Sequence, residues 1–487
     1  MTTSKHSARR FGGHAVVYLV SNLFVRGLSI VLTPLYTRVM APEHFAVVSI
    51  ANTLTSVLGI VLGMALYGCI PRLYYDHGSE ASRRRFLGTL TTFSIVFPVT
   101  VGVVLEVLGS LDLLSEVAGM PFRPHLELVI WTAVLSNLLN LPVQVYLTLE
   151  QPRRVALLNI GAGAAQLALC ILLVAVLRGG ALGVLRANCG SAFLSAVVAV
   201  ALMFRMSDVT LSWRELRAAL RYCLPLVPHL LATWALSVSD RLVLVRYVPA
   251  ADIGCYSLGY LLSTGVSMVA GAVVTPINPA ASRQLGDPET AKNIPPLGTY
   301  ALFITIVVAL LVAVNARELI SLLAPPEYAM AGSLVPWLVA GAALQAFYLV
   351  WSTGTWYSKK TGAVPFITIG SVAVNVGLNL ALVPRFGVMV SAVATAVAYA
   401  ILAVLHGLLA QKNHPIPWDY RRWTAMGGAA LASYALVERI AVDNVFGALL
   451  LKSLAGVGAF GIGLVLFGFV RREDLLALSG IVSKPRQ

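Results

Sequence analysis

Long runs of apolar residues, separated by short polar connections, fill almost the whole of this 487-residue chain. A bilayer core is about 30 Å thick, so a helix needs about 20 apolar residues to cross it. By that measure the sequence predicts fourteen membrane spans, near residues 14–38, 44–68, 86–108, 125–149, 155–177, 183–204, 222–247, 252–278, 298–323, 331–356, 363–383, 387–410, 423–442 and 446–470. The expected fold class is therefore an all-α polytopic membrane protein.

The connections between these runs leave no room for a soluble catalytic or nucleotide-binding domain. The sequence contains no GxxxxGK[ST], HExxH or GxSxG motif. Its five cysteines form no CxxC pair and lie in or beside apolar runs, so we interpret them as small apolar side chains. We therefore expect neither an enzyme nor a protein that needs a metal or other cofactor.

The positive charges are distributed unevenly between alternate connections. The N-terminus, the even-numbered connections and the C-terminal tail hold 24 of the 35 Lys and Arg residues, whereas the opposite side holds four. Since cytoplasmic loops of membrane proteins carry the excess of Lys and Arg, this predicts cytoplasmic N- and C-termini in the cell inner (plasma) membrane. The net charge of +14 thus reflects topology and contact with anionic lipid, and does not indicate nucleic-acid binding.

Two stretches of the sequence repeat at a constant offset of 208 residues. Arg38 to Pro71 aligns without gaps on Arg246 to Pro279, since 279 − 71 = 208. An even number of spans separates the two stretches, so we expect two lobes that have the same orientation in the membrane and are related by an axis along the membrane normal. The predicted organisation is an N-terminal lobe at 1–205, a cytoplasmic amphipathic linker at 206–221, a C-terminal lobe at 222–411, an appended pair of spans at 412–470 and a cytoplasmic tail at 471–487.

The first predicted span carries an arginine, Arg26, that is too far from either membrane interface for its side chain to reach it. Arg26 stands 12 residues from each predicted end, or about 18 Å at 1.5 Å per residue. Asn22, Ser29 and Thr33 continue a polar stripe at helical spacing. One interpretation is a cationic wall that faces a cavity; the other is an arginine paired with a buried acid.

Other intramembrane polar residues fall in three later spans. Asp240 and Arg241 lie in the outer third of the seventh span, where an outer-rim pair and a cavity role both remain open. Gln345 lies in the tenth span and Asn375 in the eleventh, and hydrogen bonds between helices explain them as well as ligand contacts do. Charges nearer the span ends are expected to snorkel to the interface. Among these are Glu318 and Lys452.

With these residues laid out, the chain resembles the polysaccharide (O-antigen type) flippase family of the multidrug/oligosaccharidyl-lipid/polysaccharide exporter superfamily. The resemblance runs over nearly the full length and rests on two stretches. They are NLFVRGLSIVLTPLYTRVMAPEHFAVVSI, which contains Arg26, and LPLVPHLLATWALSVSDRLVLVRYVPAADIGCYSLGY, which contains Asp240 and Arg241. Ala46 departs from the glycine that usually opens the family's second span.

This resemblance implies a carrier that moves a polyprenyl-pyrophosphate-linked oligosaccharide from the inner to the outer leaflet by alternating access. Its partners would be membrane lipids and the glycosyltransferase and polymerase machinery of surface polysaccharide synthesis. The expected substrate-binding residues are Arg26, Asn22, Ser29, Arg241, Gln345 and Asn375, and Asp240 is the acid considered for ion coupling. Asn52, Asn137 and Asn140 add amides that suit sugars.

Two other functions remain open from the sequence. A cation-coupled multidrug exporter of the same superfamily would have twelve spans and a carboxylate deep in one lobe. A membrane glycan polymerase or ligase, a different class, would place catalytic Arg or His on a long external loop. Here the longest such loop, Gly109 to Pro124, carries one arginine and two acids.

Overall fold

The computed structural model of the chain describes residues 27, 32–358, 360, 362–440, 442 and 444–469. The described part is almost entirely helical, with one two-stranded antiparallel hairpin in which Glu116 pairs with Pro121 and Val117 with Met120. It divides into two compact units, an N-terminal unit (Met1–Gly254) and a C-terminal unit (Cys255–Gln487). The boundary between the units falls within α11 (Ala250–Val274). The predicted linker at 206–221 lies earlier in the chain, and one long helix separates it from α11. The predicted lobes therefore stay a prediction.

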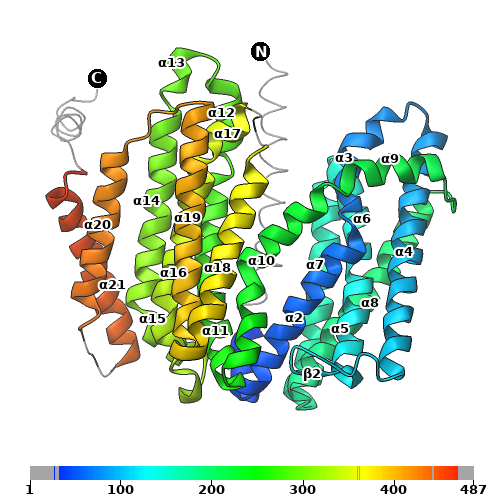
Figure 1. Cartoon of the computed structure of the whole chain (residues 1–487), viewed down its shortest axis with the longest axis horizontal. Coiled ribbons are helices and arrows are strands. Elements are labelled where there is room, and N and C mark those ends of the chain that lie inside the picture. Colours follow the sequence, from blue (N-terminus) through cyan, green and yellow to red (C-terminus); the bar gives the residue numbers. More distant parts are fainter. Residues whose placement is uncertain are drawn as a thin grey trace, which may run out of the picture. The chain divides into compact units, whose positions relative to one another are not determined.

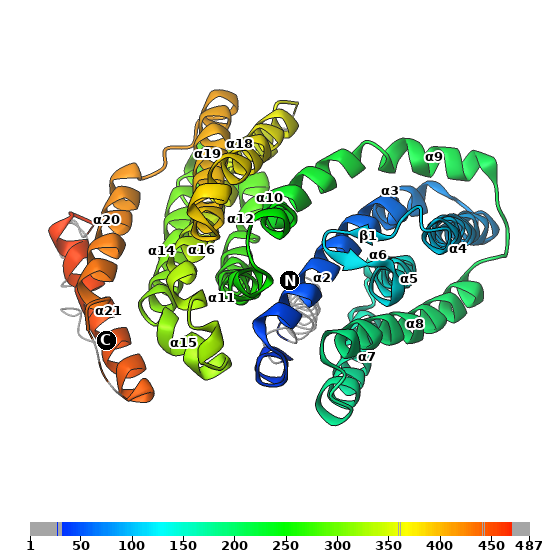
Figure 2. The same cartoon turned by 60° about the horizontal axis from the view of Figure 1, so that its bottom comes forward.

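The N-terminal unit is built from long helices interrupted by short breaks (Figures 1 and 2). Its elements are α2 (Pro42–Gly63), η1 (Leu66–Cys69), α3 (Ile70–Leu73), η2 (Tyr74–Asp76), α4 (Glu80–Ser110), β1 (Glu116–Val117), β2 (Met120–Pro121), η3 (Phe122–Leu126), α5 (Glu127–Ser136), η4 (Asn137–Leu139), α6 (Asn140–Thr148), α7 (Pro152–Cys170), η5 (Ile171–Val176), α8 (Gly180–Met206), α9 (Trp213–Cys223) and α10 (Leu226–Tyr247).

The C-terminal unit holds most of α11 and the helices that follow it. These are α12 (Ile277–Gln284), α13 (Pro288–Ala291), α14 (Ile294–Val314), α15 (Ala316–Leu323), η6 (Pro326–Tyr328), α16 (Ala331–Trp351), α17 (Thr353–Ser358), α18 (Val364–Phe386), α19 (Met389–Asn413), α20 (Tyr420–Val437) and α21 (Val445–Leu466). Within this unit α16 packs along both α14 and α19, and α20 packs along α21 (Figure 1).

Eleven helices of the described part are long and apolar enough to cross a membrane. Helices α9 and α10, which meet at a bend of 42°, make a twelfth if they are counted as one broken span. The polytopic, all-helical fold class is thereby confirmed. The count of fourteen stays a prediction, because most of the first expected span lies outside the described residues and α20 is not among the eleven.

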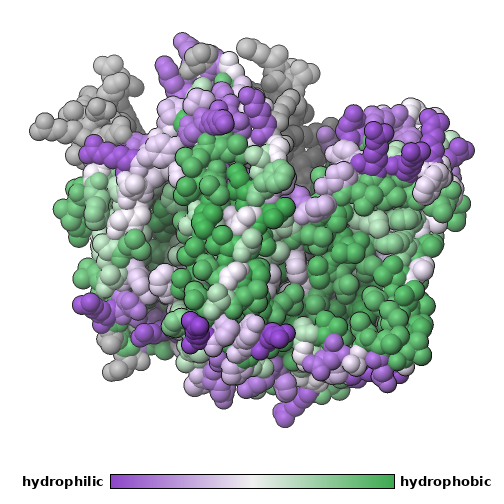
Figure 3. Space-filling model, in the orientation of Figure 1, coloured by the Kyte–Doolittle hydropathy of each residue, from purple (hydrophilic) through white to green (hydrophobic). Residues whose placement is uncertain are grey.

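The surface of the helices has the character of a surface that faces lipid. Large apolar side chains stand exposed along α4 and α21, for instance Val104, Val107, Leu450 and Leu454. Figure 3 shows the hydrophobic colour over the middle of the long helices and the hydrophilic colour gathered near their ends. In hydrocarbon every backbone N–H and C=O must be satisfied within the protein, which is why apolar runs of this length form helices.

Local sequence sets several helix ends. Pro42 and Pro152 occupy the first turns of α2 and α7, where the missing N–H costs nothing. The Asn444 side chain caps α21 by accepting from the backbone N–H groups of Phe446 and Gly447. Helix α2 ends because Met64 and Ala65 take left-handed backbone conformations, with φ of 44° and 54°.

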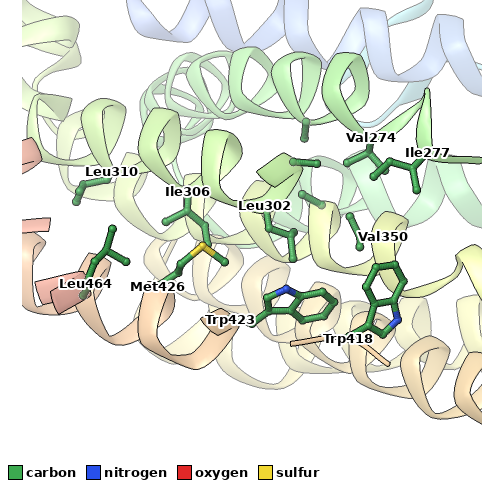
Figure 4. Packing of buried hydrophobic residues seen from close by; sticks show 14 of the residues in the cluster. Val274, Ile277, Leu302, Ile306, Leu310, Val350, Trp418, Trp423, Met426 and Leu464 are labelled. Carbon is green, nitrogen blue, oxygen red and sulfur yellow. The ribbon is translucent and has the colours of Figure 1, made fainter. Parts of the chain in front are cut away.

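The core of the C-terminal unit is a cluster of aliphatic and aromatic side chains from α11, α12, α14, α16, α20 and α21. In Figure 4 Leu302, Ile306 and Leu310 of α14 lie opposite Met426 and Trp423 of α20. Trp423 donates from Nε1 to the Thr299 hydroxyl at 3.1 Å. This packing attaches α20 and α21 to α14.

The N-terminal unit has a separate core at one end of its bundle. Leu66, Cys69 and Ile70 pack there with Phe86 and Leu90 of α4. Helix α9 lies across this end and contributes Ala219 and Cys223 to the cluster. Of the apolar face predicted for α9, Leu216 is buried and Leu220 half-buried, whereas Trp213 is exposed.

Candidate functional site

The predicted site residues fall into three groups. Asn22, Arg26 and Ser29 lie outside the described residues. Asp240 and Arg241 lie on α10 of the N-terminal unit. Gln345 on α16 and Asn375 on α18 belong to the C-terminal unit.

Asp240 and Arg241 form a buried ion pair in the N-terminal unit. Their side chains are 3% and 7% exposed, and Arg241 Nη1 lies 3.5 Å from Asp240 Oδ1. The same carboxylate oxygen accepts from the Arg241 backbone N–H at 2.8 Å. Arg241 Nε donates to the Ser49 hydroxyl of α2 at 3.0 Å. Arg241 therefore links α10 to α2, and its side chain is held by the Asp240 carboxylate and the Ser49 hydroxyl.

One face of α2 continues from Ser49 as a polar stripe. Ser49, Asn52, Ser56, Gly59 and Gly63 follow one another at spacings of three and four, which places them on one side of the helix. The Ser56 hydroxyl accepts from Trp234 Nε1 of α10 at 2.8 Å. Helix α10 is thus hydrogen-bonded to this stripe at two levels, by Arg241 and by Trp234.

Further toward the C-terminal end of α2 from the ion pair, the stripe borders a cavity of about 300 Å³. This cavity, called the amide pocket here, has polar groups from α2, η1, α5, η4 and α6. Its lining comprises Asn52, Thr55, Ser56, Gly59, Ile60, Gly63, Ala65, Tyr67, Ser136, Asn137, Asn140 and Leu230. None of these residues carries a charge, so the pocket offers amides and hydroxyls as donors and acceptors.

The amides of the pocket differ in how firmly they are held. Asn137 donates to the carbonyls of Gly59 and Ala133, both at 3.0 Å, and a Cβ built at Gly63 would lie 2.8 Å from its Oδ1. Asn137 is therefore locked against the glycine face of α2. The Asn140 side chain makes no hydrogen bond within the described part of the chain and can offer all its groups to a ligand.

A row of three amides extends from the pocket through the N-terminal unit. Gln166 of α7 donates to Asn188 of α8 at 3.0 Å, and Asn188 donates to Asn52 at 3.3 Å. Asn52 was predicted as an amide suited to sugars, but the sequence gives no sign of this row, because the residues are 136 positions apart at their widest. Among the described residues the Asn52 oxygen accepts from Asn188, and its two amide hydrogens have no acceptor.

In the C-terminal unit the predicted polar residues serve the packing of helices. Asn379 donates to the Asn375 carbonyl at 2.8 Å and accepts from the Ser391 hydroxyl of α19. Asn375 is 1% exposed, and its Nδ2 has no partner among the described residues. Gln345 lies half-buried on α16, three residues before Tyr348, whose ring meets the His406 ring edge-on at 4.7 Å between centroids.

Two of the charges expected to snorkel are paired instead. Lys452 of α21 forms an ion pair with Glu318 of α15, and their side chains are 7% and 12% exposed. The expectation for these two residues was wrong, because α21 packs against α15 and brings the opposite charges together inside the unit. Lys452 and Arg317 lie at the edge of a cavity of about 630 Å³ with a largely apolar lining.

The described residues contain no group of three or more His, Cys, Asp or Glu side chains placed to hold a metal ion. In the N-terminal unit Asp240 is paired with Arg241 and Asp208 with Arg84. The groups described above can bind a ligand through hydrogen bonds and charge.

The sequence was compared with protein families and with known proteins. The model of the family described as "Polysaccharide biosynthesis protein" matches residues 12–285, which is more than half of the chain. The chain belongs to this family. No curated protein sequence matches it. The predicted membership of the polysaccharide branch is confirmed. The family match covers the N-terminal unit from residue 12 onward, including α2, α10 and the amide pocket.

Solved structures show the same fold at low sequence identity. A lipid II flippase, MurJ, in an inward closed conformation is 14% identical with a TM-score of 0.70, covering 95% of this chain and 100% of its own. An inward-facing multidrug resistance MATE family transporter of the MOP superfamily is 14% identical with a TM-score of 0.65, covering 82% and 97%. A MATE transporter from Vibrio cholerae is 15% identical with a TM-score of 0.56, covering 85% and 98%.

Proposed function

We propose that this protein is a flippase that moves a polyprenyl-pyrophosphate-linked oligosaccharide from the cytoplasmic to the outer leaflet by alternating access, for surface polysaccharide synthesis. The observation that carries the proposal is the match to the polysaccharide biosynthesis family over a unit that contains a buried arginine and an uncharged amide pocket. A pyrophosphate needs cations and a sugar needs amides and hydroxyls. The N-terminal unit offers both kinds of group.

The proposed binding residues are those predicted from the sequence, namely Asn22, Arg26, Ser29, Arg241, Gln345 and Asn375. Arg26 is the proposed principal cation for the pyrophosphate. Arg241 already donates to Ser49 and lies beside the Asp240 carboxylate. Protonation of Asp240 would remove the negative charge next to Arg241 and strengthen its attraction for an anionic cargo. In this scheme Asp240 couples a proton to transport.

The location proposed for this activity is the inner (plasma) membrane, with both termini in the cytoplasm. Glycosyltransferases that complete the lipid-linked unit would supply the cargo, and a polymerase would consume it. No nucleotide-binding motif is present in the sequence. The energy would therefore come from an ion gradient or from removal of the product outside.

The test is the fate of lipid-linked glycans in cells depleted of this protein. The glycans are extracted, and their leaflet is assigned with a membrane-impermeant reagent that modifies only the outward-facing ones. A complete repeat unit held on the cytoplasmic leaflet is the expected result. Unpolymerised units gathered on the outer leaflet would instead indicate a glycan polymerase or ligase.

A second candidate function, a cation-coupled multidrug exporter, is favoured by the likeness of the fold to MATE transporters. It predicts that depleted cells keep their glycans on the normal leaflet and become sensitive to cationic drugs. The amide pocket argues against it, because none of its described lining residues is an acid that could balance a bound cation.

A further inference from the structure

The amide pocket is unusual for its position because it is polar without being charged. Seven of its lining residues offer an amide or a hydroxyl: Asn52, Thr55, Ser56, Tyr67, Ser136, Asn137 and Asn140. The remaining lining residues are glycine or apolar. Asn137 and Ser56 are hydrogen-bonded within the unit, whereas the Thr55 hydroxyl and the Asn140 amide have no partner among the described residues. In a bundle of apolar helices these two groups need water or a polar ligand to satisfy them.

The lining selects the chemical class of that ligand. A phosphate or a carboxylate would need a cation beside it, and an amine would need an acid, because an unbalanced charge in a poorly solvated site is costly. The described lining supplies neither. An uncharged molecule with many hydroxyl or amide groups meets these side chains without such a cost, and a sugar ring is the biological molecule that fits this description.

The volume limits the ligand to one sugar unit or two. Small-ligand pockets range from about 300 to 1,000 Å³, and this pocket lies at the lower end with about 300 Å³. An oligosaccharide would have to lie mostly outside it. The pocket is therefore suited to binding one sugar unit of a longer glycan.

The buried arginine lies near one end of the pocket. Arg241 donates to Ser49, which precedes the lining residue Asn52 by one turn of α2. The lining residue Leu230 precedes Arg241 by eleven residues of α10, which is about 16 Å at 1.5 Å per residue. A cargo that carries a pyrophosphate at one end and neutral sugars at the other has the same division of chemistry. The N-terminal unit matches that division along one helix.

We propose that the amide pocket binds one uncharged sugar ring of the lipid-linked glycan and selects neutral over acidic sugars. The inference rests on the proposed function for the identity of the cargo and on the pocket for the class of sugar. Asn140 and Thr55 would contact the sugar directly. Asn137, which is held by Gly59 and Ala133, would fix the shape of the pocket.

The test uses the full-length protein in lipid nanodiscs and saturation-transfer NMR with soluble methyl glycosides. The probes are the neutral glucoside, galactoside, rhamnoside and N-acetylglucosaminide, together with the acidic glucuronide. At least one neutral glycoside should receive saturation and the glucuronide should not. Asn140→Leu and Thr55→Val should each weaken binding of the neutral probe about fivefold, which corresponds to one lost hydrogen bond.

Asn159→Leu on α7 is the matched control, since it makes the same change in the same unit away from the pocket lining. It should leave glycoside binding unchanged. Equal binding of the glucuronide, absence of binding by all neutral probes, or wild-type binding by both pocket variants would each overturn the inference. Thr55→Val changes little in volume, so it keeps the test valid if Asn140→Leu fails to fold.

A separate measurement tests the proposed function. The wild-type protein is reconstituted into vesicles with polyprenyl-pyrophosphate-linked forms of the sugar that binds best and of glucuronic acid, and the transfer of each between leaflets is followed. Glycoside binding without transfer would remove the flippase proposal and leave the pocket inference standing. Equal transfer of the neutral and the acidic cargo would remove the pocket inference and leave the flippase proposal standing.

Discussion

Glycine 254 allows a sharp test of how α11 packs at its first turn. A Cβ built at Gly254 would lie 2.0 Å from the Pro42 carbonyl oxygen and 2.7 Å from its carbon, where α2 begins. Ordinary C···O contacts are no closer than about 3.3 Å, so a Gly254→Ala variant needs about 1.3 Å of additional separation between two helix backbones. No flexible side chain can give way, because the nearest atoms belong to the backbone of Pro42.

The expected cost of this substitution can be set against a gain elsewhere on the same helix. Overpacking of a well-packed contact costs about 1–3 kcal/mol. Gly265 and Gly271 also lie in α11, and a Cβ at either position meets nothing within 4 Å. Replacing a helical glycine by alanine in open space stabilises by about 0.5–1 kcal/mol. Both variants gain this helix propensity, so Gly254→Ala should be about 1–3 kcal/mol less stable than Gly265→Ala.

The assay is the thermal unfolding midpoint of each purified variant in one detergent, at matched protein concentration. The midpoint should fall for Gly254→Ala and should stay or rise for Gly265→Ala and Gly271→Ala, so that helix propensity and detergent binding cancel. If Gly254→Ala unfolds at the same temperature as Gly265→Ala, the close approach of α11 to α2 is not present, and the reasoning fails.

Three further predictions concern charged side chains. Lys452→Met should lower the unfolding midpoint strongly, since removal of one partner of a buried ion pair costs about 3–5 kcal/mol. Adding Glu318→Gln to this variant should recover most of the lost stability. A double variant that is less stable than Lys452→Met alone would contradict the pairing. Asp240→Asn and Arg241→Gln should be non-additive in a double-mutant cycle by about 1–3 kcal/mol, because the side chains lie 3.5 Å apart, whereas simple additivity would mean that the pair contributes nothing. Arg26→Ala should abolish glycan export while membrane insertion and expression, followed by fluorescence of a C-terminal fusion, stay at wild-type level; normal export by this variant would remove Arg26 from the proposed site.

The spans were predictable because each depends on a local property. Long apolar runs must satisfy their own backbone groups in lipid, and eleven expected spans coincide with helices that are long and apolar enough to cross. The interruptions were not predictable. Helix α2 was expected to run to residue 68 but ends at Gly63, because Met64 and Ala65 adopt left-handed backbone conformations. Such conformations are usually predicted from a glycine, and neither position has one.

The candidate site was only partly accessible from the sequence. Asn52, Asn137 and Asn140 were predicted as amides suited to sugars, yet nothing in the linear pattern places them around one cavity. The same cavity is bordered by Gly59 and Gly63 of α2. In the structure it is the Asn137 amide that approaches them, a contact between residues 78 positions apart. Pairings such as Lys452 with Glu318 likewise depend on which helices become neighbours.

The 208-residue offset predicts which residues of α2 and α11 correspond. Helices α2 and α11 begin at residues 42 and 250, and 250 − 42 = 208, so the offset holds at the start of both helices. The polar stripe of α2 maps onto hydroxyl, aromatic and glycine positions of α11, namely Ser257, Tyr260, Thr264, Ser267 and Gly271. If the offset marks a duplication, the two copies have kept polarity at most of these positions while the functional groups changed, and the Asn52 amide of α2 corresponds to the Tyr260 ring of α11.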